Sequence, residues 1–351
     1  MVAKNKGEWS EVLVLAQGLA EGKFPLVNER FDLLPSEVSF TAAKITPAKG
    51  LEWIRSCLNS EPTGANLALQ AELRELAKEL AQDLLTKHTG SFHSIPGNKI
   101  VEALATEKLS PGSKVDVWLK LTSALTESSS WRGFSVKSHV GGSPTLLNAS
   151  SHTNFVFKVI GTTSQIAHLE GDTPVRKKVS GFLDSGGSLV FDFVSSEQFT
   201  YNLNFSDSRL AADLAEMLTT YYSGEARTVV SLIETVAARK NDFTYRNMLR
   251  HRVSRLLLDA SRGMVPGSFW DGKSEVHGGF ILVTPSAEIG IIPLENTDLV
   301  SHYLLSNTTF DTPSEQRHAF SLFGHREKLK HGHLFEHGGP RFALNLQIRF
   351  S

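Results

Sequence analysis

Two stretches near the start of the chain repeat apolar residues with the period of an α-helix. In residues 5–23, Asn5 followed by Glu8 also has the spacing of a capping box at a helix start. Residues 67–88 carry a second apolar stripe. The two stripes are Trp9, Val12, Leu13, Ala16 and Leu19, then Leu69, Leu73, Leu76, Leu80 and Leu84. A shorter helix is predicted over residues 97–107.

Two later segments alternate apolar and polar residues with the period of a β-strand. They are KVDVWLKL at residues 114–121 and GFSVKS at residues 133–138, and the polar stretch between them predicts a β-hairpin. This places Asp116 on the first strand. On the second strand, Phe134 and Val136 face one side of the sheet, and Ser135 and Lys137 face the other.

The rest of the chain mixes strand and helix patterns. Residues 30–48 are expected to form short strands and turns, residues 189–205 a hairpin, and residues 207–258 mostly helices. The final third contains three strand-like runs, GGFILV, EIGIIPL and ALNLQIRF. The expected fold class is therefore α/β (α+β), and the length of 351 residues predicts about two domains.

The amino-acid composition is that of a globular protein and argues against a secreted or membrane-spanning one. Apolar residues make up 40% of the chain and charged residues 21%, as in an ordinary globular protein. The single cysteine, Cys57, excludes an intramolecular disulfide and favours a reducing cytoplasm. The charged start of the chain does not look like a signal peptide, and no segment has the length of a membrane span. An intracellular protein without a membrane anchor is expected.

Charge is balanced overall but uneven along the chain. The formal net charge of −1 argues against a protein that binds polyanions over its whole surface. Residues 227–262 nevertheless contain eight Arg or Lys against three Asp or Glu, a local excess of 8 − 3 = +5. This segment is a candidate phosphate-contacting surface, and a solvated helix face is the alternative interpretation.

Asp116 and Lys137 are the residues whose types suggest catalysis. A carboxylate and a lysine on neighbouring strands can converge on one Mg²⁺ and one phosphodiester. The cation would neutralise the phosphate and activate water, and the lysine would orient or deprotonate that water. The alternative is that both are solvated residues at the edge of a sheet.

Small hydrogen-bonding side chains follow the hairpin. Such residue types contact phosphates and base edges, although they also occur in any turn or helix cap. The candidates are Ser143, Thr145, Asn148, His152, Thr153 and Asn154. Five histidines near the end raise the possibility of zinc, but no cysteine accompanies them and a solvated loop is favoured. They are His318, His325, His331, His333 and His337.

Several fragments, in this order along the chain, resemble the HpaII-type restriction endonucleases. They are KNKGEWSE, GFSVKS, GGSPTLLNASSHTNF, HGGFILV, NTTFDTPSEQRH and LNLQIRF, and they run from residue 4 to residue 350. The resemblance implies a type II restriction endonuclease with a PD-(D/E)XK core, in which helices flank a mixed central sheet, plus a strand-rich C-terminal portion. Such an enzyme would cut duplex DNA with Mg²⁺.

The resemblance also implies roles for particular residues. Asp116 looks like the metal-binding aspartate of the motif and Lys137 like its lysine, whereas Ser135 stands where the motif has Glu or Asp. No acidic residue lies between residues 138 and 169, so the missing carboxylate is expected from the N-terminal helix. Glu11 is preferred over Glu8, which has a capping role as its alternative, and Glu102 is a further candidate. The arginines expected to contact DNA are Arg246, Arg250, Arg252 and Arg317.

The wider expectations follow from the same resemblance. Residues 1–205 would form the nuclease core and residues 206–351 a DNA-recognition part. The target would be a short C/G-rich palindrome such as CCGG, which favours a homodimer. A companion DNA methyltransferase and a bacterial cytoplasmic location are also implied. The alternatives are a site-specific or methylation-dependent DNA-binding protein of the same fold with weak or no cleavage, and a repair nuclease.

Overall fold

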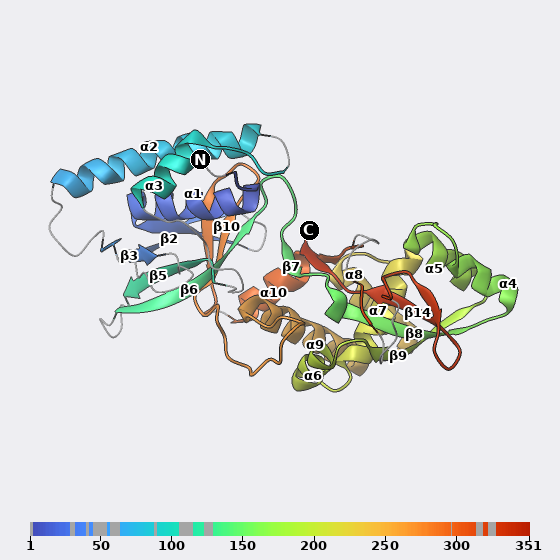
Figure 1. Cartoon of the computed structure of the whole chain (residues 1–351). Coiled ribbons are helices and arrows are strands. Elements are labelled where there is room, and N and C mark those ends of the chain that lie inside the picture. The colour runs from blue at the N-terminus through green and yellow to red at the C-terminus, as the bar shows by residue number, and fades with distance from the viewer. Residues whose placement is uncertain are drawn as a thin grey trace. The chain divides into compact units, whose positions relative to one another are not determined.

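The chain folds into two compact units, each of which combines segments that are distant in sequence (Figure 1). A computed structural model describes residues 3–28, 32–39, 42–44, 55–56, 64–87, 90–104, 115–122, 129–295, 297–313, 319–321 and 328–351. Unit 1 consists of Met1–Pro144 and Ser274–Val300, and unit 2 of Thr145–Lys273 and Ser301–Ser351. The predicted division at residue 205 does not coincide with these bounds, because strands after residue 274 complete the sheet of unit 1.

Unit 1 is built on an eight-stranded mixed sheet in the order β2-β1-β11-β10-β6-β5-β3-β4. The predicted hairpin is confirmed, since β5 and β6 pair antiparallel. On its other edge β6 pairs parallel with β10. The strands are β1 (Lys23–Val27), β2 (Leu33–Ser39), β3 (Ala42–Lys44), β4 (Arg55–Ser56), β5 (Val117–Thr122), β6 (Ser129–Ser138), β10 (Gly279–Val283) and β11 (Ile289–Pro293).

Three helices lie on one side of this sheet: α1 (Lys6–Glu21), α2 (Gly64–Thr86) and α3 (Ile95–Ala103) (Figure 1). The predicted capping box starts α1, since the Glu8 N–H donates to Asn5 Oδ1 (3.0 Å) and the Asn5 N–H donates to Glu8 Oε2 (2.8 Å). The predicted stripe of α2 is confirmed, because Leu73, Leu76, Leu80 and Leu84 are buried and Leu69 is partly buried. The third helix starts two residues earlier than predicted, with the Ser94 side chain as its N-cap.

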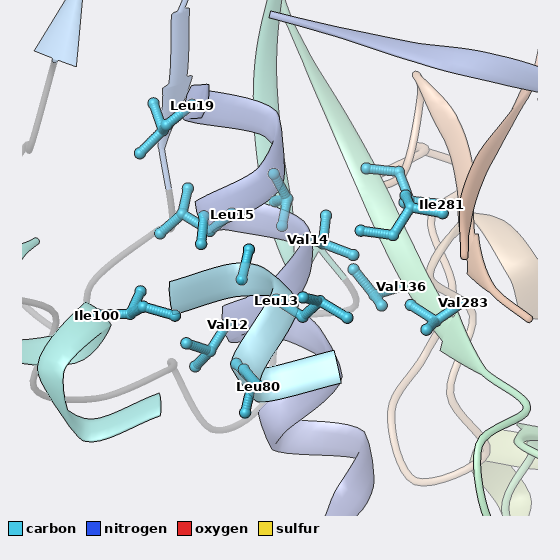
Figure 2. Packing of buried hydrophobic residues seen from close by; sticks show 14 of the residues in the cluster. Val12, Leu13, Val14, Leu15, Leu19, Leu80, Ile100, Val136, Ile281 and Val283 are labelled. Carbon is cyan, nitrogen blue, oxygen red and sulfur yellow. The ribbon is translucent and has the colours of Figure 1, made fainter. Parts of the chain in front are cut away.

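Helix α1 is buried on nearly all sides because it lies between the other two helices and the sheet. Figure 2 shows Val12 close to Leu80 of α2 and Ile100 of α3, whereas Leu13 and Val14 point toward the sheet. The sheet contributes Val136, Ile281 and Val283 to the same cluster (Figure 2). The core of unit 1 therefore fixes α1 against β6 and β10.

Unit 2 has two smaller sheets, with strand orders β13-β14-β8-β9 and β12-β15-β7. Its strands are β7 (Thr145–Leu147), β8 (Asn154–Ile160), β9 (Ser188–Val194), β12 (Thr308–Phe310), β13 (Leu334–Glu336), β14 (Pro340–Asn345) and β15 (Ile348–Phe350). Its helices are α4 (Thr163–Ile166), α5 (Val175–Asp184), α6 (Glu197–Ser206), α7 (Leu210–Ser223), α8 (Val229–Lys240) and α9 (Phe243–Arg262), with short 3₁₀ turns at Ser151–Thr153 and Ala167–Leu169. Helix α10 (Thr297–Ser306) spans the sequence boundary between the units.

The prediction of a hairpin over residues 189–205 is wrong, because only its first half is a strand. Strand β9 is followed by α6, whose N-cap Ser196 accepts a hydrogen bond from the Phe199 N–H (3.3 Å). Phe199, Asn202 and Leu203 are buried at helical spacing. The mostly helical character predicted for residues 207–258 is confirmed by α7, α8 and α9.

The predicted fold class is confirmed as mixed α/β with a mixed central sheet. Among the helices in the described part of the chain, none is both long and apolar enough to span a membrane.

A test of the unit 1 core is Gly97→Ala. A Cβ atom at this position in α3 would lie 2.4 Å from a ring carbon of Trp9, which is fully buried. We expect Gly97→Ala to lower the free energy of unfolding by about 1–3 kcal/mol, because the rigid indole cannot move aside cheaply. The control is Gly142→Ala, where nothing lies within 4 Å of the new Cβ. Urea unfolding measures both, and equal stabilities would contradict this packing.

Candidate active site

Ser135 and Lys137 lie on β6 in the middle of the unit 1 sheet, between β5 and β10. In the parallel pairing Ser135 is opposite Phe280 and Lys137 is opposite Leu282. Asp116 immediately precedes β5 rather than lying within it, but its N–H donates to the Phe134 carbonyl (2.9 Å) and so extends the pairing with β6. The hairpin thus brings Asp116 beside Ser135, as its register predicts.

Two hydrogen bonds orient the Asp116 carboxylate. Both the Ser135 hydroxyl (3.0 Å) and the Val136 N–H (2.7 Å) donate to Asp116 Oδ2. Ser135 is only 2% exposed. Ser135, which stands where the resemblance leads us to expect an acidic residue, therefore contacts Asp116 and restricts its rotation.

Glu11 of α1 joins Asp116 in one electrostatic cluster. The pKa of Glu11 is raised to about 8, first by burial and then by the negative charges of Asp116 and Glu8, while Lys137 and Lys4 act to lower it. The hydrogen bond between the Ser10 and Ser138 hydroxyls (2.8 Å) ties α1 to the end of β6 next to these groups. The structure therefore brings together the helix and hairpin residues that the sequence singled out separately.

Lys137 is half-buried, and burial lowers its pKa. The negative charges of Asp116 and Glu11 act in the opposite direction. A lysine whose pKa moves toward neutrality is better suited to accept a proton from water than an exposed one.

The two other acidic candidates are placed differently. Glu8 Oε2 accepts the Asn5 N–H, so its carboxylate serves the helix cap, although its charge still reaches Glu11. Glu102 is exposed on α3 and is not among the groups that shift the pKa of Glu11. Of the three candidates, Glu11 is the one that burial and charge link most closely to Asp116.

The donor set of this cluster fits a hard divalent cation. Two carboxylates that disfavour each other's ionised forms would be stabilised by positive charge between them. Across the described residues there is no group of three or more His, Cys, Asp or Glu side chains suited to a metal. Mg²⁺ characteristically uses one or two carboxylates and completes its coordination with water and substrate phosphate.

Thr153 and Asn154 were expected to contact DNA, and the structure corrects this expectation. Both are fully buried in unit 2. The Thr153 hydroxyl donates to Asn345 Oδ1 (3.1 Å), and Asn345 Nδ2 donates to Asn154 Oδ1 (3.0 Å). These side chains connect β8 to β14 and have no access to a ligand outside the fold.

The other residues of that segment lie nearer the surface. Ser143 and Asn148 are exposed, and Thr145 is half-buried at the start of β7. His152 is half-buried, with Nδ1 3.0 Å from the Ser196 hydroxyl. Among the predicted base-contacting residues, these four remain accessible.

Within the basic segment of residues 227–262, some arginines form ion pairs with acidic side chains and others do not. Arg252 is 3% exposed and forms ion pairs with Asp213 (2.9 Å) and Asp207 (3.1 Å), so it is an internal anchor and not a phosphate contact. Arg246 lies on the surface in an ion pair with Glu234 (2.7 Å). Arg250 is half-buried and has no side-chain hydrogen bond or ion pair to any residue in the described ranges. Arg317 lies outside the described residues.

The C-terminal histidines do not form a metal site where they are described. His331 is buried, and its Nδ1 accepts the Asn345 N–H (3.1 Å). His333 and His337 do not belong to any metal-binding group among the described residues. His318 and His325 lie outside the described part of the chain.

Sequence reasoning missed Lys4 and the Ser10–Ser138 contact. Lys4 is half-buried, its Nζ lies 6.0 Å from the centre of the Trp9 ring, and its charge lowers the pKa of Glu11. The position of Lys4 two residues before α1 does not indicate its effect on the pKa of Glu11. The Ser10–Ser138 hydrogen bond depends on how α1 packs against β6, which no local pattern indicates.

Comparison with known proteins identifies relatives over nearly the whole chain. The model of the HpaII restriction endonuclease family matches residues 5–350. The type II restriction enzyme HpaII of Haemophilus parainfluenzae is 29% identical over 365 aligned positions, which cover 99% of this chain and 98% of that protein. No solved structure matches the chain.

The raised pKa of Glu11 predicts a pH dependence of stability without metal. Its pKa in the folded chain is about 8, above the ordinary value of 4.5 for a glutamate side chain. The folded state therefore binds more protons than the unfolded state between these values, so the free energy of unfolding falls as pH rises from about 4.5 to 8. Glu11→Gln removes this contribution and should show a smaller fall. Urea unfolding in EDTA at pH 5 and pH 8 measures the difference, and parallel pH profiles would contradict the placement of Glu11.

Proposed function

The chain belongs to the HpaII restriction endonuclease family and is a type II site-specific deoxyribonuclease; we propose that it cleaves duplex DNA with Mg²⁺ held by Asp116 and Glu11. The observation that carries this proposal is the cluster of Glu11 on α1 with Asp116 and Lys137 on the β5–β6 hairpin. A protein that only bound DNA would have no need of such a half-buried cluster.

Each residue of the cluster has a distinct part in the proposal. Asp116, oriented by Ser135 and the Val136 N–H, and Glu11 would hold the cation. When bound, Mg²⁺ supplies positive charge to the scissile phosphodiester and lowers the pKa of the attacking water. Lys137 orients that water and accepts its proton. Ser135 acts as a positioning residue through Asp116.

Type II restriction endonucleases generally need a divalent metal ion, and this chain is expected to share that requirement. The assignment to Mg²⁺ is supported by the carboxylate oxygens of the cluster, because no Cys or His of the described residues is among the groups that shift the pKa of Glu11. The PD-(D/E)XK motif is assigned to Asp116 and Lys137, with Ser135 in the middle position.

The target and the partners belong to the same proposal. The resemblance of the sequence fragments to the HpaII-type restriction endonucleases favours a short C/G-rich palindrome such as CCGG as the target. A palindrome favours a two-fold homodimer, and a restriction enzyme implies a companion methyltransferase that protects the host DNA. Ser143, Thr145, Asn148, His152 and Arg250 are the accessible residues proposed to contact DNA.

A DNA-binding protein without cleavage is the second candidate, and Ser135 favours it because it replaces an acidic residue of the motif. A repair nuclease of the same fold is the third. Incubation of a plasmid with the protein and Mg²⁺, followed by sequencing of the ends, separates the three. Ends that share one short palindrome support the first, absence of cutting supports the second, and ends without a shared sequence support the third.

Replacing the central residues tests the catalytic assignment. Asp116→Ala and Lys137→Ala should each reduce plasmid cleavage by at least about 10³-fold, because each removes electrostatic stabilisation worth several kcal/mol. Lys87→Ala and Asp172→Asn remove exposed charges far from the cluster in sequence and should cut like the parent. Thermal unfolding shows whether the variants are folded. Parental cleavage by folded Asp116→Ala would refute the assignment.

A second experiment distinguishes Glu11 from Glu8. Glu11→Gln keeps the shape of the side chain but removes its charge, so it should raise the Mg²⁺ concentration needed for half-maximal cleavage and slow the reaction strongly. Glu8→Gln should keep most activity and cost about 1 kcal/mol of stability or less through the cap. The control is Glu79→Gln on the exposed side of α2. If Glu11→Gln cuts at the parental rate and Mg²⁺ concentration, α1 is not part of the site.

A further inference from the structure

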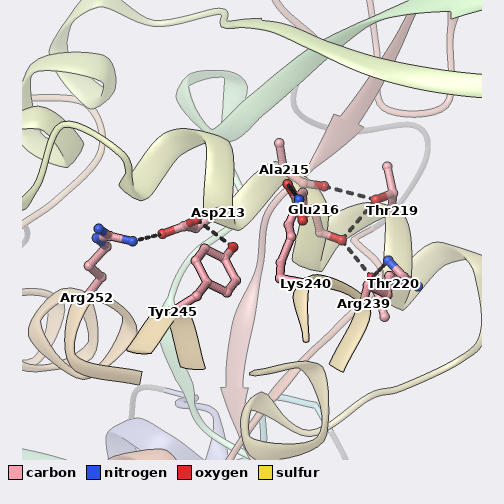
Figure 3. Close-up of polar contacts among 9 residues, drawn as sticks. All are labelled: Asp213, Ala215, Glu216, Thr219, Thr220, Arg239, Lys240, Tyr245 and Arg252. Atoms are coloured by element: carbon pink, nitrogen blue, oxygen red, sulfur yellow. Dashed lines mark hydrogen bonds and ion pairs between the residues drawn. The ribbon is translucent and has the colours of Figure 1, made fainter. Parts of the chain in front are cut away.

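Helix α9 is attached to unit 2 through one face. Tyr245 Oη donates to Asp213 Oδ1 (2.9 Å), and Arg252 Nη1 donates to Asp213 Oδ2 (2.9 Å) (Figure 3). Tyr245 and Arg252 are seven residues apart and therefore share a face of the helix. Leu249 and Val253 on the same side are fully buried. This anchoring to α7 gives α9 a fixed orientation.

The opposite face of α9 carries four polar side chains, which we call the α9 stripe: Asn247, Arg250, His251 and Ser254. Their i, i+3, i+4 and i+7 spacing places them on one side of the helix. Asn247 and His251 are exposed, and Arg250 and Ser254 are half-buried. None of the four side chains has a hydrogen bond or ion pair with any residue that the structure describes.

Three other arginines of α9 have ion-pair partners, whereas Arg262 in its last turn, like the stripe, has none among the described residues. Arg246 pairs with Glu234, Arg252 with Asp213 and Asp207, and Arg255 with Asp259. On the neighbouring helix α8, Arg239 pairs with Glu225 and Lys240 with Glu216 (2.6 and 2.9 Å), both of which precede that helix in the chain. The stripe therefore differs from these paired residues in that its hydrogen-bonding groups have no partner in the described part of the chain.

The side chains of the α9 stripe are of the types that hydrogen-bond to duplex DNA. Asn and Arg make paired hydrogen bonds to adenine and guanine edges in the DNA major groove, and Ser and His are further groups able to hydrogen-bond there. No Asp or Glu occurs from residue 243 to residue 258, so the first four turns of α9 add no negative charge that would repel phosphates. An α-helix also fits the width of the major groove.

We propose that the α9 stripe enters the major groove of duplex DNA and reads base edges through Asn247 and His251, while Arg250 contacts a phosphate. This inference rests on the proposed function and deepens it by naming the specificity-determining surface. A second copy of this chain is the other occupant that such a face could receive, and the experiment below separates the two.

The test is a binding selection without metal, so that it does not depend on cleavage. The parent protein and its variants are incubated in EDTA with short duplexes that have a randomised centre, and the bound duplexes are sequenced. The parent should enrich one short motif. Asn247→Ala and His251→Ala should each lose discrimination at one or two base pairs by about 10- to 100-fold, while binding to a fixed unrelated duplex stays within about twofold.

Matched controls isolate the stripe. Asn204→Ala removes another exposed helical asparagine that has no side-chain partner in the described parts of the chain, and it should enrich the parental motif. Arg250→Ala should weaken binding to all duplexes and reduce the salt dependence of binding by about one unit of slope. Lys177→Ala, which removes an exposed charge on α5, should leave that slope unchanged.

The outcomes decide between the inference and the proposed function. If Asn247→Ala and His251→Ala enrich the parental motif with parental discrimination, or if the parent enriches no motif, the inference is overturned, even when the parent cuts plasmid DNA. The sedimentation velocity of the parent and of the two variants is measured as well. If Asn247→Ala or His251→Ala changes the oligomeric state while DNA discrimination is unchanged, the inference is overturned in favour of a contact between copies of the chain. If the variants lose discrimination but the parent does not cut with Mg²⁺, the inference stands and the proposed cleavage fails.

Discussion

The repulsion between the Asp116 and Glu11 carboxylates is the interaction on which the account of unit 1 depends. Half-buried carboxylates of like charge disfavour ionisation, and burial together with Asp116 and Glu8 raises the pKa of Glu11 to about 8. A fold tolerates such a pair only where other contacts hold both groups in place. The same arrangement gives a divalent cation a favourable position, because positive charge removes the repulsion.

The surrounding structure supplies those contacts. Asp116 is held by the Ser135 hydroxyl and the Val136 N–H, and α1 is confined between two helices and the sheet, with the Ser10–Ser138 hydrogen bond beside the cluster. Strand β10, more than a hundred residues later in the chain, pairs with β6 and completes this support. Rigidity of this kind is what a catalytic site requires, since small displacements of charged groups reduce catalysis strongly.

Features that depend on local sequence could be predicted, and features that depend on distant contacts could not. The capping box of Asn5 and Glu8, the leucine stripe of α2 and the β5–β6 hairpin all follow from spacing within one element. The return of the chain to unit 1 after residue 274, the burial of Thr153 and Asn154 around Asn345, and the ion pairs of Arg252 involve partners that no local pattern identifies. The convergence of Glu11 on Asp116 was expected only because the resemblance left one carboxylate to be found, and the α9 stripe becomes visible only when the engaged residues of that helix are known.

The pH dependence of divalent metal binding tests the central claim most directly. Mn²⁺ can replace Mg²⁺ as a probe, and its unbound fraction is measured by electron paramagnetic resonance. If Glu11 and Asp116 share the cation, Glu11 must lose its proton when the metal binds, so the affinity should rise with pH between 6 and 8 and level off above the pKa of about 8. An affinity that is the same at pH 6 and pH 8 would contradict the account. It would mean that metal binding removes no proton from Glu11, so Glu11 would not be a ligand.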